Sequence, residues 1–153
     1  MDRTMKSAQG FTLLELVVTM AIVGIMAGIA VAKFDHLAKV NDINDDMHRI
    51  SSFIHTQEKK AFSRKQEIRL TVAGSDITTL VDPGGAAIAG ESLSLNNALS
   101  ATGSPFTIDT RGNIATGNIR LTAANPGAEF DCVQLDYIRI RLGVKNGTAC
   151  NEI

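Results

Sequence analysis

The sequence predicts an α+β protein in which one long N-terminal helix precedes a head of antiparallel β-strands. Three observations support this fold class. Residues 11–32 form a run of 22 residues without Lys, Arg, Asp or Pro. Apolar residues then recur at three- and four-residue steps to about Ser63, which indicates an amphipathic helix. From Gln66 onward apolar and polar residues alternate, which favours half-buried strands. We expect four segments: a polar leader at 1–10, a membrane-spanning helix at 11–33, an amphipathic helix at 34–64 and a β-rich head at 65–153.

The bulk composition fits one domain with an appendage. The chain has 153 residues, of which 44% are hydrophobic and 20% are charged, so an ordinary packed core can form. Its net charge is -1, and therefore no global basic field attracts nucleic acid. The chain has no Trp and one Tyr, so it also has few aromatic side chains that could stack on nucleic-acid bases.

The apolar run is long enough to cross a bilayer. At about 1.5 Å per residue it spans roughly 33 Å, compared with a hydrocarbon core of about 30 Å. The polar leader MDRTMKSAQG comes before it, which is not the order of an ordinary secretory signal. Arg3 and Lys6 should stay on the cytoplasmic side, leaving the C-terminal end of the span outside. Met1 and Met5 are both candidate starts.

Glu15 is the only acid inside this run. Placing an ionisable side chain in a membrane span costs roughly 2.5–3.5 kcal/mol of insertion free energy at the helix centre and less near an end. We therefore interpret Glu15 as a functional residue that has a partner. Removal of the leader after Gly10 would expose a cationic amine on Phe11, one helical turn from Glu15. The alternative is a lone carboxylate that reaches the headgroups.

The segment GFTLLELVVTMAIVGIMAGIAVAKF closely resembles the N-terminal segment of type IV prepilins and pseudopilins. The resemblance implies that residues 1–10 are a prepilin leader, that a prepilin peptidase cuts after Gly10, and that Phe11 is N-methylated. It also implies that Glu15 neutralises the N-terminus of a neighbouring subunit during filament assembly. The resemblance covers about 25 residues of the chain.

Two glycines are candidates for helix packing within the span. Many members of the resembled family carry a proline where Ala32 stands here. Gly24 and Gly28 offer similar freedom, at about 1 kcal/mol each relative to Ala, and they form a small-xxx-small face for close helix contact. The alternative is that a membrane helix merely tolerates them.

The second half of the helix is expected to dock on the head. Its apolar stripe consists of Phe34, Leu37, Val40, Ile43, Met47, Ile50, Ile54 and Ala61 or Phe62. The Asn41–Asp46 cluster has poor helix propensity, which predicts a bend or fray there. The histidines at 36, 48 and 55 lack the spacing of a metal site and are read as solvated.

The head is expected to contain several strands separated by turns. Residues 67–72 alternate, Ala73–Asp76 predicts a turn, and residues 77–81 would pair back. Asp82–Gly90 is rich in Gly and Ala and reads as a loop. The further strand candidates are Ser92–Leu95, Pro105–Thr110, Asn118–Thr122 and Phe130–Leu142. In the last of these Ile138, Ile140 and Leu142 would share one face, with Arg139 and Arg141 on the other.

The two cysteines, Cys132 and Cys150, are too few for a four-ligand zinc site. In a chain with an export element they predict one disulfide in an oxidising compartment. It would stabilise the head by roughly 3 kcal/mol on the chain-entropy model. The alternative is a pair of free buried thiols.

No catalytic constellation is present. The chain lacks a nucleophile elbow, a Walker loop, an H-E-x-x-H pair and a C-x-x-C pair, so we expect neither an enzyme nor a bound cofactor or metal. Several aspartates lack calcium-loop spacing and are read as solvated loop residues: Asp76, Asp82, Asp109, Asp131 and Asp136.

The stretch PFTIDTRGNIATGNIRL, two strands around a Gly-containing turn, resembles the head of GspH/FimT-type minor pseudopilins. This implies a minor subunit of a type II secretion pseudopilus or a type IV pilus. Its partners would be other pilin or pseudopilin subunits, the prepilin peptidase and an inner-membrane assembly platform. It would sit in a bacterial inner membrane with its head in the periplasm and then enter the filament.

A DNA-binding role is the alternative. FimT-like pilins are associated with DNA uptake, and a basic face of the head could contact phosphates. This face would be made of Arg111, Arg120, Arg139, Arg141 and Lys145. Alternating Arg residues on a strand more often mark its solvent side, so DNA is the less favoured partner.

Overall fold

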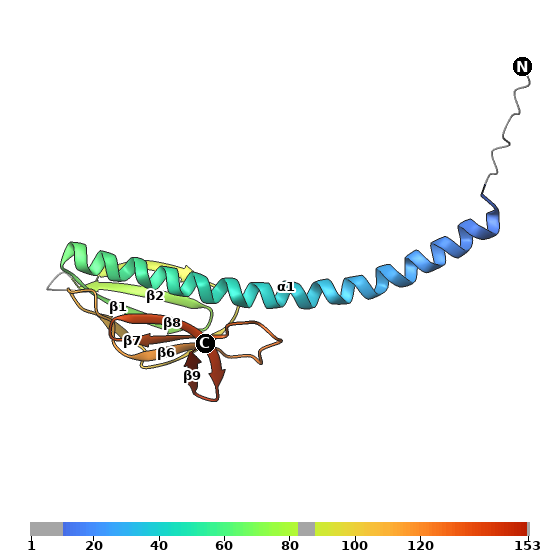
Figure 1. Ribbon diagram of the computed structural model, residues 1–153. Coiled ribbons are helices and arrows are strands. Elements are labelled where there is room, and N and C mark those ends of the chain that lie inside the picture. Colours follow the sequence, from blue (N-terminus) through green and yellow to red (C-terminus); the bar gives the residue numbers. More distant parts are fainter. Residues whose placement is uncertain (1–10, 83–87, 153) are drawn as a thin grey trace, which may run out of the picture. The chain divides into compact units, whose positions relative to one another are not determined.

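The computed structural model describes residues 11–82 and 88–152, and Figure 1 shows the order of the elements. By contacts the chain divides into two compact units, one that reaches to Leu37 and one that starts at Ala38. The helix α1 (Leu13–Arg64) belongs to both units. The second unit, called the head below, also contains β1 (Glu67–Ala73), β2 (Asp76–Asp82), β3 (Ile88–Ser94), β4 (Leu99–Thr102), β5 (Phe106–Ile108), β6 (Gly117–Leu121), β7 (Cys132–Asp136), β8 (Arg139–Asn146) and β9 (Ala149–Glu152). The α+β fold predicted from the sequence is confirmed.

The helix α1 ends close to where the periodicity predicted. The Gln66 N–H donates to the Ala61 carbonyl at 3.2 Å, which closes the last turn. Lys65 adopts the left-handed conformation at that point, with φ of 54°, where glycine is usual. Its Nζ lies 3.9 Å from the centre of the Phe62 ring, an attraction that helps to hold the turn.

The strands form two antiparallel sheets. One has the order β3-β2-β1-β5 and the other the order β4-β6-β7-β8-β9. The β1–β2 hairpin turns at Gly74, which has φ of +62°, and Ala73 pairs with Asp76. The turn and the alternating strand that were predicted here are therefore confirmed.

One apolar core joins α1 to both sheets. The helix contributes Met47, Ile50, Ile54 and Ala61, all fully buried. Facing residues come from the first sheet (Ile68, Leu70, Ile77, Phe106 and Ile108) and from the second (Leu99, Ile119, Val133 and Leu135). Within the head, the helix therefore lies along the strands as in Figure 1, and its predicted stripe is buried from Ile43 onward.

The single strand predicted at Phe130–Leu142 is wrong. The chain reverses at Tyr137–Ile138, so that β7 and β8 form a hairpin in which Asp136 pairs with Arg139. Ile138 is 71% exposed in the turn, whereas Ile140 and Leu142 pack against the core. The turn contains neither Gly nor Pro, and its apolar residues continue the alternation on both sides. For that reason the sequence pattern did not reveal it.

Three smaller expectations also need correction. Asp82 ends β2 and residues 88–90 begin β3, so the predicted loop at Asp82–Gly90 is shorter; residues 83–87 lie outside the described residues. The short strands β4 and β9 were not predicted. The helix does not fray at Asn41–Asp46, for the reason given below.

Candidate functional site

The N-terminal end of α1 is organised by Thr12. Its Oγ1 accepts the Glu15 N–H at 3.3 Å, and its carbonyl accepts the Leu16 N–H at 3.2 Å. Thr12 is therefore the N-cap and Glu15 the third helical residue, the T-x-x-E spacing of a capping box. A carboxylate in the first turn also opposes the positive end of the helix dipole. Sequence reasoning singled out Glu15 but missed the threonine that positions it; Gly10 lies outside the described residues.

The first turns of the helix present a continuous apolar surface. Phe11 is 86% exposed, and every large apolar side chain from Leu13 to Val31 is exposed as well. By length and composition α1 can cross a membrane. An apolar patch larger than a few hundred Å² marks a surface that lipid or protein covers.

Gly24 and Gly28 lie on this part of the helix. A Cβ built on either residue meets no atom within 4 Å, so neither glycine is required by a contact inside the chain. The pair offers room for a close approach by another helix.

Polar side chains on α1 hold the connections of the head. Asp46 is fully buried, and its Oδ2 accepts the backbone N–H groups of Asn96 at 3.1 Å and Asn97 at 2.9 Å. The Oδ1 of Asn44 accepts the Phe130 N–H at 3.2 Å. The residues that predicted a fray thus bind the β3–β4 and β6–β7 connections, and these bonds compensate for their poor helix propensity.

The disulfide between Cys132 and Cys150 is present, with the two Cα atoms 5.9 Å apart. Cys132 lies on β7 and Cys150 on β9, so the bridge passes over the intervening strand β8. Cys132 pairs with Gly143 of β8, and a Cβ on Gly143 would lie 3.2 Å from the Cys150 Sγ and 2.2 Å from the Asn151 carbonyl oxygen. Glycine at 143 therefore leaves room for the bridge and for β9.

Two of the five predicted basic residues are occupied inside the head. The Arg120 guanidinium donates to the Thr148 carbonyl at 2.6 Å and to the Thr102 hydroxyl at 2.8 Å. The Lys145 Nζ donates to the Leu121 carbonyl at 2.9 Å and also to the Ala123 carbonyl.

Of the other three basic residues, one is also paired and two are exposed. Arg141 pairs with Asp136 at 3.3 Å, while Arg111 and Arg139 are exposed. Arg111 lies in the turn after β5 and Arg139 begins β8. Three of the five residues are therefore engaged inside the head, and the predicted face is not a set of five free cations.

Two aspartates that were read as solvated have structural roles. Asp131 is buried, and its carboxylate accepts the Lys145 N–H. Asp109 accepts the backbone N–H of Arg111 at 2.7 Å and that of Asn113 at 2.9 Å. Burial raises the pKa of the Asp109 carboxyl, but the hydrogen bonds from Asn113 and Arg111 outweigh it and lower the pKa below its ordinary value.

The histidines take part in local contacts. His48 meets the edge of the Phe130 ring, with 5.6 Å between ring centres, and the His55 Nδ1 lies 2.9 Å from a Glu58 carboxylate oxygen. Among the described residues no group of three or more His, Cys, Asp or Glu side chains is placed to hold a metal ion.

Two comparisons with known proteins found a similarity, one in the N-terminal segment and one in the fold. Residues 5–31 match the prokaryotic N-terminal methylation motif. The fold is similar to the crystal structure of the minor pseudopilin EpsH from the type II secretion system of Vibrio cholerae, with a TM-score of 0.53 and 9% identity over 71% of this chain and 98% of that chain. No curated protein matches the sequence. The chain therefore combines an N-terminal methylation motif with a fold similar to that of a minor pseudopilin.

Proposed function

Because the methylation motif stands on a chain with the fold of a minor pseudopilin, we propose that this protein is a minor pseudopilin subunit of a type II secretion pseudopilus or a type IV pilus. A prepilin peptidase cuts it after Gly10 and methylates the new N-terminus at Phe11. The motif at residues 5–31 includes both positions. The observation that carries the proposal is the apolar surface of residues 11–31, which is exposed on a helix whose later turns contribute buried residues to a folded head.

Two successive environments account for that surface. Before assembly the apolar segment spans the bacterial inner membrane, with Arg3 and Lys6 on the cytoplasmic side and the head in the periplasm. A periplasmic head agrees with the disulfide, which persists in oxidising compartments. During assembly the same surface moves from lipid to the apolar helices of other subunits, helped by an inner-membrane platform.

Glu15 selects the axial position of the subunit in the filament. After cleavage the Phe11 amine is cationic, and in the filament it faces the Glu15 carboxylate of a neighbouring subunit. Thr12 supports this role because it fixes the first helical turn and with it the position of Glu15. Loss of one partner from a buried ion pair costs about 3–5 kcal/mol, which lowers incorporation by about a hundredfold or more.

The experiment compares Glu15→Gln with wild type in cells. The substitution keeps the size and removes the charge, so membrane levels and leader cleavage should remain normal while crosslinking to the major subunit falls by about a hundredfold. Glu67→Gln in the head is the matched control, since it removes the same charge outside the apolar segment. N-terminal sequencing of the wild type should begin at Phe11, and Gly10→Val should leave the leader attached.

Two results would contradict the proposal. The first is normal crosslinking of Glu15→Gln at normal membrane levels, which would show that the carboxylate is not the assembly contact. The second is a mature chain that starts after residue 20, which would remove the assembly segment itself.

DNA uptake is not put forward as a second function. The Arg120 and Lys145 side chains donate to backbone carbonyls of the head, so they are not available to phosphates without breaking those bonds. Salt-dependent binding of DNA by the full-length protein in detergent is the measurement that would favour this alternative.

A further inference from the structure

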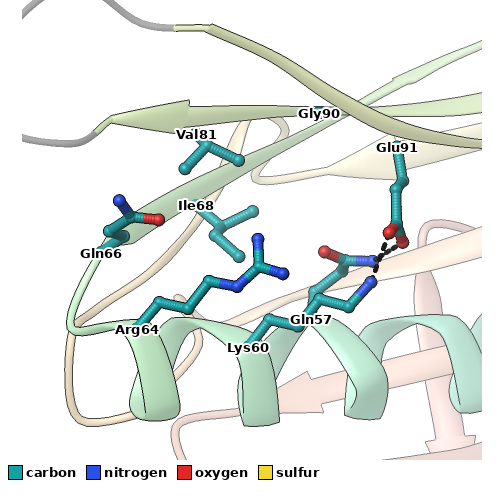
Figure 2. A pocket seen from close by; sticks show the side chains of 8 residues that line it. All are labelled: Gln57, Lys60, Arg64, Gln66, Ile68, Val81, Gly90 and Glu91. Carbon is teal, nitrogen blue, oxygen red and sulfur yellow. Dashed lines mark hydrogen bonds and ion pairs between the residues drawn. The ribbon is translucent and has the colours of Figure 1, made fainter.

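A small pocket lies at the C-terminal end of α1, against the face of β1, β2 and β3. Figure 2 shows its lining side chains: Gln57, Lys60 and Arg64 from α1, Gln66 and Ile68 at the start of β1, Val81 from β2, and Gly90 and Glu91 from β3. Its volume is about 70 Å³. A water molecule takes up about 30 Å³ and a small-molecule site about 300–1,000 Å³. The pocket therefore fits the head of one side chain and is too small for a cofactor.

The strand β3 is held tightly at the rim of this pocket. The Thr79 hydroxyl donates to the Glu91 carbonyl at 2.8 Å, at an irregularity in the pairing of β2 with β3. A Cβ on Gly90 would lie 2.3 Å from the Thr79 Oγ1, so only glycine allows the approach. The Thr79 side chain thus fixes the backbone of β3 at Glu91.

Glu91 is already occupied by two donors from α1. Its carboxylate accepts the Gln57 Nε2 at 3.0 Å and the Lys60 Nζ, as the dashed lines in Figure 2 indicate. These bonds, that of Lys60 first, lower the pKa of the Glu91 carboxyl, so it is ionised at neutral pH. Lys60 and Glu91 therefore neutralise each other.

Arg64 is the second cation of the pocket. Its guanidinium lies beside Ile68 in the middle of the pocket (Figure 2). Among the described residues it has no ion pair within 4.0 Å and no side-chain hydrogen bond, and its charge acts on Glu91 only from a longer distance, as the weakest of the effects that lower the pKa of that carboxyl. The lining holds two cations and one carboxylate, so one positive charge of the pocket remains uncompensated. The Arg64 guanidinium, which carries this charge, faces the buried side chain of Ile68.

We propose that this pocket binds one carboxylate side chain, an Asp or a Glu, of a neighbouring protein subunit, with Arg64 as its ligand. The planar guanidinium matches a carboxylate with two parallel hydrogen bonds. The single uncompensated charge suits a monoanion better than a phosphate group, which carries about -1.5 to -2 at pH 7. The identity of the partner rests on the proposed function, because a filament subunit is surrounded by other subunits.

The first test detects the partner in cells. A photocrosslinking amino acid at Gln66 in the full-length chain should capture a neighbouring subunit. Arg64→Gln should lower that capture about tenfold, since a charge-assisted hydrogen bond is lost. Arg139→Gln is the matched control, because it removes an exposed arginine from the other sheet and should leave the capture unchanged.

The second test measures the anion preference of the wild-type protein directly. The full-length chain in detergent micelles is labelled with nitrogen-15 at arginine, and the Nε–H signals are followed during titration with sodium acetate. Sodium phosphate and sodium chloride at equal ionic strength serve as comparisons. The Arg64 signal should shift saturably with acetate and less with the other two anions, while the Arg139 signal should show no saturable shift.

Three results would overturn the inference: unchanged capture with Arg64→Gln, an acetate response at Arg64 no larger than at Arg139, or a stronger response to phosphate. The titration uses the wild-type chain, so its result does not depend on whether a variant folds. Leader cleavage and the Glu15→Gln crosslinking test the proposed function separately. If those succeed and the Arg64 tests fail, only the carboxylate site is wrong.

Discussion

Replacement of Asp46 by Ala should strongly destabilise the head. The carboxylate is fully buried and accepts two backbone N–H groups and the Asn97 Nδ2, the last at 2.8 Å. Arg49 lies 3.6 Å away and adds a weaker attraction. Each hydrogen bond to a charged group contributes about 1.5–3 kcal/mol, and a buried donor left unpaired costs about 1–3 kcal/mol. We therefore expect a loss of about 3–5 kcal/mol, a large share of the roughly 5–15 kcal/mol of a domain.

The neighbouring residue provides a matched control. Asp45 is exposed on the same helix, so Asp45→Ala makes the same chemical change without removing a buried acceptor. That variant should lie within about 0.5 kcal/mol of wild type. The helix propensity of Ala exceeds that of Asp in both variants, so the difference between them isolates the burial of Asp46.

Thermal unfolding of the full-length protein in detergent, followed by circular dichroism, measures the difference. For a chain of this size about 3–5 kcal/mol corresponds to a decrease in Tm of roughly 6–20 °C. Amide hydrogen exchange at Asn96 and Asn97 should accelerate in Asp46→Ala and not in Asp45→Ala, because Asp46 holds that connection. Equal melting of the two variants, with unchanged exchange at these amides, would refute the reasoning.

Two further predictions concern the second sheet and the β5 turn. Reduction of the Cys132–Cys150 disulfide should lower the Tm of the head, since a loop of 18 residues corresponds to roughly 3 kcal/mol; full alkylation of the native, unreduced protein would rule the bridge out. The lowered pKa of Asp109 means that its ionised form is favoured by folding, so this stability is complete well above the ordinary value of 3.8 and is lost as the pH falls through the folded pKa. Acid unfolding of Asp109→Asn should lack that contribution, and an acid transition identical to that of wild type would contradict the assignment.

The sequence determined the features that depend on neighbours along the chain. A helix brings residues three and four apart onto one face, so the apolar run, the stripe from Ile43 and the end near Arg64 could be predicted from spacing alone. The placement of Glu15 in the first turn follows from the same local rule. The cysteine count limited Cys132 and Cys150 to one bridge or two thiols, and the fold then showed the bridge.

Tertiary structure decided the features that depend on residues far apart in sequence. Asp46 lies in a cluster with poor helix propensity. Only its hydrogen bonds to Asn96 and Asn97, which follow it by 50 and 51 positions, show why the helix continues. Strand alternation looks the same on either side of a tight turn, so the reversal at Tyr137–Ile138 required the pairing partners.

The surface charges show the same division. The sequence can place arginines on alternating positions of a strand, but it cannot say which carbonyl or carboxylate comes within reach. In the fold Arg120 reaches the Thr148 carbonyl, whereas Arg64 lies beside Ile68 in a pocket whose one carboxylate, Glu91, is bound by Lys60. Hydrogen bonds and ion pairs act over a few ångströms. The distances between side chains far apart in the sequence are set only by the tertiary structure.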